Sequence, residues 1–313
     1  MKLKILFFGT PSFAKTCLEE LIIKEYEICG VITSPDKKSG RGLKLKKSIV
    51  KVFSEENKLK IFQPENLKNK KFLKEIKELK VDIGVVVAFR KIPKELWEIP
   101  NFGTFNLHAS LLPNYRGAAP INWSIIFKEK VTGVTTFLIN DNIDSGDLLL
   151  QEKISIDHNE NAGSLHDKLA IIGKNIIIKT IDLFPLKFKP KKQIIIGNEN
   201  IAPKLTRENT KIDWSNTLED IYNKIRGLSP SPGAWTFLVS GKENIIFKIF
   251  KASTEPLIDE NAGNEIIIIK KNLFVKHSDG LLKLEIVQLP NKKIMQTSSL
   301  LNGFSFKSGS KVI

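Results

Sequence analysis

The sequence predicts an α/β protein, with an open Rossmann-like, mostly parallel sheet followed by a small C-terminal β-barrel of OB-like type. Short apolar strands alternate with amphipathic helices through the first half of the chain. One of these strands, 83–88, is β-branched and apolar without alternation, as expected for a strand buried on both faces of a parallel sheet. The barrel is predicted by short β-rich runs separated by turns after residue 230.

The first elements are a strand at 4–8, a Gly-Thr-Pro turn and a helix at 12–24. Apolar residues recur on one face of that helix, which is the pattern of a helix packed on a sheet. A second strand follows at 27–33. Further along we expect strands at 60–62, 83–88, 104–107, 134–139 and 148–154, and helices at 49–56, 70–79, 121–127 and 164–183.

The C-terminal part begins with a helix at 218–227 that ends at a glycine. We place a catalytic α/β domain at 1–185, a linker at 186–206 with a short strand at 194–196, and the barrel domain at 207–313. The expected barrel strands are 234–239, 245–253, 265–269, 273–276 and 281–289.

Composition limits the classes of protein that the chain could be. The formal net charge is +15 over 313 residues, which indicates a polyanionic partner. Cys17 and Cys29 fit neither a metal site nor a disulfide framework, so we expect two buried reduced thiols. The apolar run 5–8 is too short for a signal peptide, and no run reaches the about 20 apolar residues of a membrane span. A cytoplasmic protein is therefore expected.

Positive charge is concentrated between Lys37 and Lys51, where seven basic residues occur and no acidic residue does. Such a run is commonly solvated surface, but an exposed basic loop is also how proteins bind phosphate backbones. The sequence alone leaves both interpretations open.

Candidate catalytic groups lie where the strand at 104–107 ends. Asn106 and His108 are two residues apart, so their side chains leave an extended chain on the same face. Pro113 and Gly117 then impose irregular structure, and Asp144 follows in an acidic turn. A histidine at a strand end can be purely structural and Asx residues favour turns for local reasons, so a structural role stays an alternative for each.

Several motifs carry a resemblance that runs in order through nearly the whole chain. The most specific are NLHASLLPNYRGAAP at 106–120 and IDSGD at 143–147; weaker ones are FGTPSFA at 8–14, SGRG at 39–42, FQP at 62–64, KIDW at 211–214 and IRGLSP at 225–230. On these motifs the chain resembles the formyltetrahydrofolate-dependent formyltransferases, and most nearly those that act on methionyl-tRNA.

The resemblance implies an enzyme that moves a formyl group from 10-formyltetrahydrofolate to the α-amino group of initiator methionyl-tRNA for translation initiation, without a metal. It implies catalytic roles for Asn106, His108 and Asp144. We expect a monomer, with tRNA as partner and no membrane. By the same resemblance, folate would contact Val87, Ala88, Phe89, Ser110, Leu111, Leu112 and Pro113, and tRNA would contact Arg41, Lys44, Lys46 and Lys47. The barrel domain is expected to contact tRNA as well, because 16 basic and 11 acidic residues follow residue 203; a scaffold domain with scattered lysines is the alternative.

One departure is Arg90, which stands where relatives usually carry glycine after a tyrosine. Its side chain could crowd the folate pocket or point outward, so its effect on folate affinity is open. Other acceptors are alternatives: a nucleotide-linked amino sugar, or water. A nucleic-acid-binding protein with a decayed catalytic domain is the alternative from a different class. The features of tRNA that are read, and how methionine is selected, are not predicted.

Overall fold

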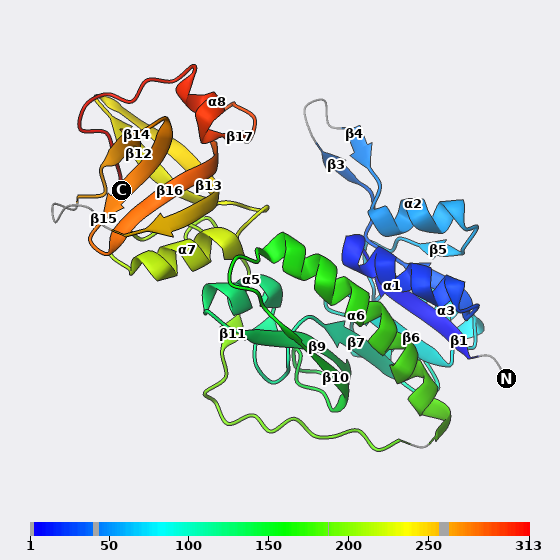
Figure 1. Cartoon of the computed structure of the whole chain (residues 1–313). Helices are drawn as coiled ribbons and strands as arrows, with labels where there is room; N and C mark the ends of the chain where they lie inside the picture. Colours follow the sequence, from blue (N-terminus) through cyan, green and yellow to red (C-terminus); the bar gives the residue numbers. More distant parts are fainter. Residues whose placement is uncertain (1–2, 40–43, 187, 257–262) are drawn as a thin grey trace. The chain divides into compact units, whose positions relative to one another are not determined.

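The computed structural model describes residues 3–39, 44–186, 188–256 and 263–313 (Figure 1). The chain divides into two compact units, each assembled from separate stretches of sequence. The first unit comprises Met1–Pro120, Val131–Ile154 and His166–Ile201, and the second comprises Ile121–Lys130, Ser155–Leu165 and Ala202–Ile313. The domain boundaries that we placed at residues 185 and 207 stay a prediction.

A mixed sheet forms the centre of the first unit. Its strands in the described residues are β1 (Lys4–Gly9), β2 (Glu27–Ile32), β5 (Ile61–Phe62), β6 (Ile83–Val87), β7 (Thr104–His108), β9 (Val131–Leu138) and β10 (Leu148–Ser155). Their order is β10-β9-β7-β6-β1-β2-β5. Neighbours from β5 to β7 are parallel, and β9 joins β7 antiparallel. All five residues of β6 are buried, as its unbroken apolar run predicted.

Helices connect these strands, as expected for an open α/β sheet. They are α1 (Ser12–Ile23), α2 (Ile49–Glu56), α3 (Lys70–Glu78), α4 (Lys94–Trp97), α6 (Ala162–Leu183) and the 3₁₀ turn η1 (Phe184–Leu186). At the N-termini of α2 and α3, a side chain accepts a hydrogen bond from a backbone amide that has no partner within the helix. Ser48 accepts from the Lys51 amide, and Asn69 accepts from the Phe72 amide. Such N-caps contribute about 1 kcal/mol each. The first residues of α6 belong to the second unit.

The two cysteines lie in the first unit as free thiols. Burial raises the pKa of Cys17 far above its ordinary value. Burial also raises the pKa of Cys29 to about 11, and its thiol donates to the Ile5 carbonyl. Both are therefore protonated at neutral pH. Cys17 is buried as expected, whereas Cys29 is only partly buried.

The basic segment forms a hairpin of β3 (Lys37–Ser39) and β4 (Lys44–Lys46), paired antiparallel. Figure 1 shows it extending away from the sheet near α2. At its base the Asp36 carboxylate accepts from Gln63 at 2.8 Å and from Lys51 at 2.6 Å. These two partners, Gln63 first, lower the pKa of Asp36. The base of the hairpin is thereby tied to α2 and to the segment after β5.

The second unit is an antiparallel barrel. Its described strands are β12 (Ala234–Ser240), β13 (Glu243–Glu255), β14 (Ile266–Ile269), β15 (Asn272–His277), β16 (Gly280–Gln288), β17 (Met295–Gln296) and β18 (Lys311–Val312). Six of them follow the order β14-β15-β16-β13-β12-β18, and β17 pairs with β16. An antiparallel bridge between Glu265 and Lys311 joins the two edges. The predicted barrel class is therefore confirmed.

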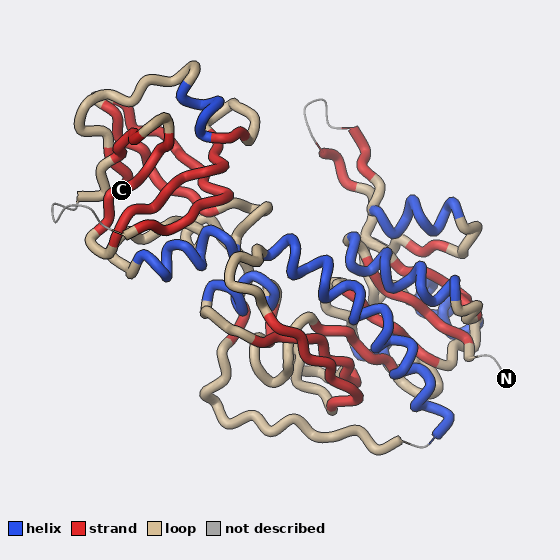
Figure 2. The backbone as a smooth tube through the Cα atoms, viewed as in Figure 1, coloured by secondary structure: helices blue, strands red, loops and turns tan. Residues whose placement is uncertain are grey.

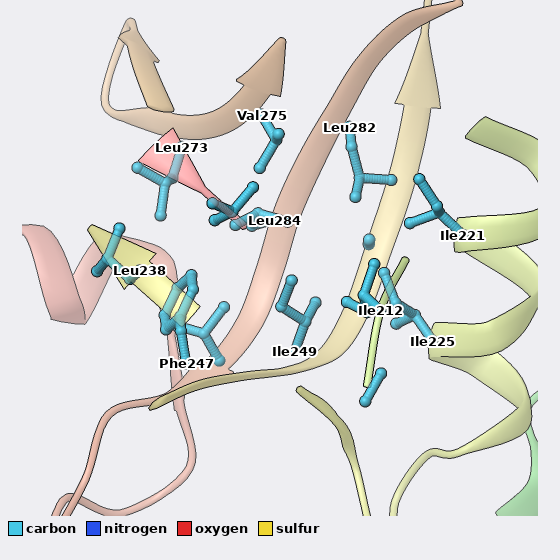
Figure 3. Close-up of a cluster of buried hydrophobic side chains, with 14 of the residues drawn as sticks. Ile212, Ile221, Ile225, Leu238, Phe247, Ile249, Leu273, Val275, Leu282 and Leu284 are labelled. Atoms are coloured by element: carbon cyan, nitrogen blue, oxygen red, sulfur yellow. The ribbon is translucent and has the colours of Figure 1, made fainter. Parts of the chain in front are cut away.

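One end of this barrel is filled by a helix. The unit contains α7 (Leu218–Gly227), α8 (Thr297–Leu301) and most of α5 (Pro120–Ile126). Figure 3 shows Ile221 and Ile225 of α7 beside Ile249 and Leu282 of the sheet. Each of these side chains is at most 2 % exposed. Full burial of such a side chain is worth about 1.5–3 kcal/mol, so apolar packing is the main stabilisation of this unit.

Candidate active site

Asn106 and His108 lie on β7, as the sequence predicted, and their alternation puts both side chains on one face of the sheet. His108 is buried, whereas Asn106 is half-buried. Within the described residues the Asn106 side-chain amide makes no hydrogen bond. It is therefore a donor that is free to bind a ligand.

His108 has a defined orientation because both of its ring nitrogens face acceptors. Nε2 lies 2.8 Å from the Tyr115 carbonyl oxygen, which can only accept, so Nε2 carries a proton and donates. Nδ1 lies 3.8 Å from Oδ2 of Asp144. In the neutral ring Nδ1 is thus the basic nitrogen, and a proton added there would face a carboxylate.

Asp144 is held by the backbone around it. Its Oδ2 accepts from the Gly117 amide at 3.0 Å, which directs the carboxylate toward the histidine. Asp144 itself has a φ of +50°, a left-handed conformation that is uncommon outside glycine. The structure therefore brings His108 and Asp144 together, with Asn106 on the same strand.

Two contributors to this site were not predicted as functional groups: the Tyr115 carbonyl and the Gly117 amide. Both lie within the motif at 106–120. Because they act through backbone atoms, their side chains carry no chemical signal. The one signal in the sequence was the glycine at position 117, which predicts irregular backbone there. The structure agrees, because Gly117 has a φ of +126°.

The residues expected to contact folate fall into two groups. Val87 is fully buried at the end of β6, Ala88 is exposed, and the half-buried Phe89 ring packs 5.9 Å from that of Phe8. In the second group, Ser110 is fully buried and its hydroxyl donates to the Asn114 carbonyl, so that hydroxyl is already engaged.

The loop at 110–113 is fixed to the neighbouring strands by polar contacts. The Thr135 hydroxyl donates to the Ser110 carbonyl at 2.6 Å and accepts from the Leu112 amide at 3.1 Å. Gln151 donates to the Leu112 carbonyl at 2.8 Å. Leu112 is buried, whereas Leu111 and Pro113 are partly accessible. These contacts attach the loop to β9 and β10, and within 110–113 only Leu111 and Pro113 have accessible side chains.

A cavity of about 580 Å³ opens next to the segment that follows β6. Neither predicted folate group lines it; it begins one residue beyond Phe89. Its lining is mixed in charge, and it consists of Glu65, Asn66, Leu67, Lys68, Arg90, Lys91, Ile92, Pro93, Lys94, Glu95, Trp97, Asn140 and Asp141.

Arg90 borders this cavity with a side chain that is already bonded. Its guanidinium donates to the Pro64 carbonyl and, at 2.9 Å, to the Glu65 carbonyl. It also lies 5.8 Å from the Phe89 ring centre. Arg90 therefore joins the segment after β6 to the turn after β5.

The predicted tRNA-contacting residues belong to the basic hairpin and to the residue that follows it. Arg41 lies outside the described residues, and for Lys44 only the backbone, in β4, is described. Lys46 is exposed. Lys47 is paired with Glu55 at 2.8 Å, and this hydrogen bond raises the pKa of the lysine. Lys46 is thus the described member of the set that carries an unpaired charge.

Among the described residues, no three His, Cys, Asp or Glu side chains gather as metal ligands would. None of the helices in the same parts of the chain combines the length and apolarity needed to cross a membrane.

Comparison with known proteins defines the class. Residues 1–181 match the formyl transferase family, and residues 204–305 match the formyl transferase C-terminal domain. The chain belongs to the formyl transferase family, which confirms the resemblance found in the sequence.

Individual relatives and solved structures are similar to this chain over nearly its whole length. Methionyl-tRNA formyltransferase of Flavobacterium johnsoniae is 47% identical over 99% of both chains, and that of Bacteroides fragilis is 41% identical over 99% of this chain and 98% of its own. HypX from Aquifex aeolicus, solved with tetrahydrofolic acid, has a TM-score of 0.66 at 19% identity, over 96% of this chain and 47% of its own. The sugar 3N-formyl transferase WlaRD has a TM-score of 0.64 at 23% identity, over 94% of this chain and 100% of its own. These two structures share the fold.

Proposed function

We propose that this protein transfers the formyl group of 10-formyltetrahydrofolate to the α-amino group of methionyl-tRNA, with the initiator tRNA as its acceptor. The pairing of His108 and Asp144 beside the open Asn106 amide supports the chemistry. Relatives over 40% identical and of almost equal length, named methionyl-tRNA formyltransferase, support the acceptor.

The reaction needs a place for negative charge and a route for one proton. The amine attacks the formyl carbon, a new C–N bond forms, and the carbonyl electrons move to oxygen. The bond to N10 then breaks, and the proton lost by the amine is delivered to N10. Asn106 donates its amide hydrogen to the developing oxyanion, and loss of one such donor costs about 2.7–4 kcal/mol of barrier.

His108 handles the proton at Nδ1, because Nε2 is occupied by the Tyr115 carbonyl. Asp144 stabilises the imidazolium that forms, since its carboxylate faces Nδ1 at 3.8 Å. The Gly117 amide keeps that carboxylate in place. Each of the three predicted catalytic residues thus has a separate role.

We propose that folate occupies the cavity beside residues 90–95. Its volume of about 580 Å³ lies within the range of small-molecule pockets, about 300–1,000 Å³. Asn140 and Asp141 supply donors and acceptors that could pair with the polar edge of a pterin. Val87, Ala88, Phe89 and residues 110–113 would then support the formyl end next to His108. Arg90, bonded to the turn at 64–65, would form one wall.

We propose that Arg41, Lys44, Lys46 and Lys47 contact the phosphate backbone of the tRNA, and that the barrel domain supplies further contacts. We also propose that the enzyme acts as a monomer in the cytoplasm. In sedimentation we expect a single species of monomer mass for the protein alone, and one with the mass of one protein chain plus one tRNA when tRNA is added.

The direct test is formylation of initiator methionyl-tRNA by the purified protein with 10-formyltetrahydrofolate. Uncharged tRNA, free methionine and a nucleotide-linked amino sugar are the control acceptors. Transfer to the charged tRNA alone is expected. Formylation of the sugar, or release of tetrahydrofolate without a formylated product, would replace this proposal with one of the other acceptors.

A further inference from the structure

The segment at 188–201, which we name the strap, packs on the loops that hold the candidate catalytic residues. Figure 2 shows it as loop over nearly its whole length, ending in β11 (Ile201–Ala202). Lys191 exchanges two backbone hydrogen bonds with Leu148, and β11 pairs with β8 (Arg116–Gly117). The strand predicted at 194–196 is wrong, because all three isoleucines are exposed and lie outside any strand.

The strap contacts two residues that share an unusual backbone conformation. Tyr115 has a φ of +60° and Asp144 a φ of +50°. These are also the residues that face the two ring nitrogens of His108. Left-handed conformations of non-glycine residues persist only where surrounding contacts impose them.

Gln193 of the strap supplies such contacts at Asp144. Its side-chain Nε2 donates to the Asp144 carbonyl at 3.1 Å and to the Gly146 carbonyl at 2.7 Å. Both partners can only accept, which fixes the orientation of the side-chain amide. Gly146 is itself confined, since a Cβ there would lie 1.6 Å from the Leu138 carbonyl oxygen. One side chain thus bridges both ends of the 144–146 turn.

The other end of the strap acts on Tyr115. The Tyr115 backbone amide donates to the Asn200 carbonyl at 2.6 Å, and the Asn200 side-chain amide donates to the Tyr115 hydroxyl at 3.2 Å. Glu199 stiffens the strap, because its carboxylate accepts from the amides of Ile196 and Gly197. These bonds, with that of Ile196 first, lower the pKa of Glu199.

We infer that Gln193 is a positioning residue for the formyl transfer proposed above: it holds the 144–146 turn so that the Asp144 carboxylate faces Nδ1 of His108. The inference rests on that proposed function. Gln193 touches neither reacting group, so its effect on turnover passes through Asp144. Replacement of its side chain should therefore affect the chemical step more than substrate binding.

The test compares Gln193→Ala and Gln193→Met with Lys192→Ala, the exposed neighbour. Methionine keeps the length and most of the volume of glutamine but has no donor. We expect both Gln193 variants to lose about 10–100-fold in kcat, by analogy with the loss of hydrogen-bond partners that orient metal ligands, with the KM for either substrate unchanged. An unchanged kcat in the methionine variant would overturn the inference.

A double-mutant cycle separates positioning from general damage. In an Asp144→Asn background, Gln193→Met should cost almost nothing further, because the carboxylate that it positions is already gone. If the two losses instead multiply, Gln193 does not act through Asp144 and the inference fails.

Amide exchange of the protein without substrates gives an independent readout. The Gly117 amide donates to Asp144, so it should exchange faster in Gln193→Met than in Lys192→Ala. Equal exchange overturns the inference even if the enzyme is active. Faster exchange in a protein that formylates no acceptor upholds the positioning contact while the proposed function fails.

Discussion

The catalytic edge of the first unit and the core of the second bury their residues for different purposes. At the edge, buried His108, Ser110 and Thr135 are polar, and each has a hydrogen-bond partner at a defined distance. In the barrel, Phe247 and Leu284 are fully buried among apolar side chains. The hydrogen bonds at the catalytic edge orient side chains, whereas the apolar side chains in the barrel fill its interior. Changes at the edge should therefore reduce turnover, whereas changes in the barrel core should reduce stability.

The largest effect is expected from Phe247→Ala in the barrel core. The lost burial and the cavity left behind should lower the free energy of unfolding by about 3–5 kcal/mol. Ile268→Ala, half exposed on β14 of the same barrel, is the matched control and should cost little. Urea denaturation measures both variants. Turnover per folded molecule should stay normal in each variant. A large loss of turnover per folded molecule in Phe247→Ala would contradict the assignment of the barrel core to stability alone.

Asn106→Ala should give the converse result at the catalytic edge. Turnover should fall by about 10²–10³, as for loss of one oxyanion donor. Among the described residues the Asn106 amide has no hydrogen-bond partner, so its removal breaks no structural contact. Unfolding and tRNA binding should be unaffected. Asn101→Ala, which removes an exposed amide bonded to Asp82, is the control. Single-turnover formylation measures the effect, and normal turnover in Asn106→Ala would remove the oxyanion role.

Lys46→Ala should have a smaller effect, confined to tRNA. Removing one phosphate contact should weaken tRNA binding and lower the slope of log affinity against log salt by about 1. Folate binding should not change. Lys74→Ala, an exposed lysine on α3, is the matched control. Identical salt slopes for the two variants would mean that the hairpin is ordinary solvated surface.

The smallest effect concerns the base of the hairpin and depends on pH. Because Gln63 and Lys51 lower the pKa of Asp36, the folded state binds a proton less readily than the unfolded state. The stabilisation is present above the ordinary aspartate pKa of about 3.9 and is lost as pH falls through the lower folded value. Asp36→Asn should thus be less stable than the wild type near neutrality and equal to it in acid, by thermal denaturation. A difference in melting temperature between Asp36→Asn and the wild type that stays constant from neutral pH into acid would contradict this effect of Asp36.

Much of the fold could be predicted because its signals are local. The unbroken run of β6, the alternation of helices and strands, and the short barrel strands each depend on residues close in sequence. The strand predicted at 194–196 failed for the same reason: three isoleucines favour a strand locally, but in the part of the chain that the structure describes they pair with no strand. Side-chain identity also pointed to His108 and Asp144, which the structure places face to face.

The sequence by itself determined which side chains can do chemistry here, because an imidazole, an amide and a carboxylate are recognisable wherever they stand. Only the tertiary structure decided how they are held. The Tyr115 carbonyl and the Gly117 amide are backbone groups that almost every residue type has, so the sequence does not show that these two act on the site. Gln193 reaches Asp144 across 49 residues of chain, and such a contact exists only once the strap has folded onto the sheet.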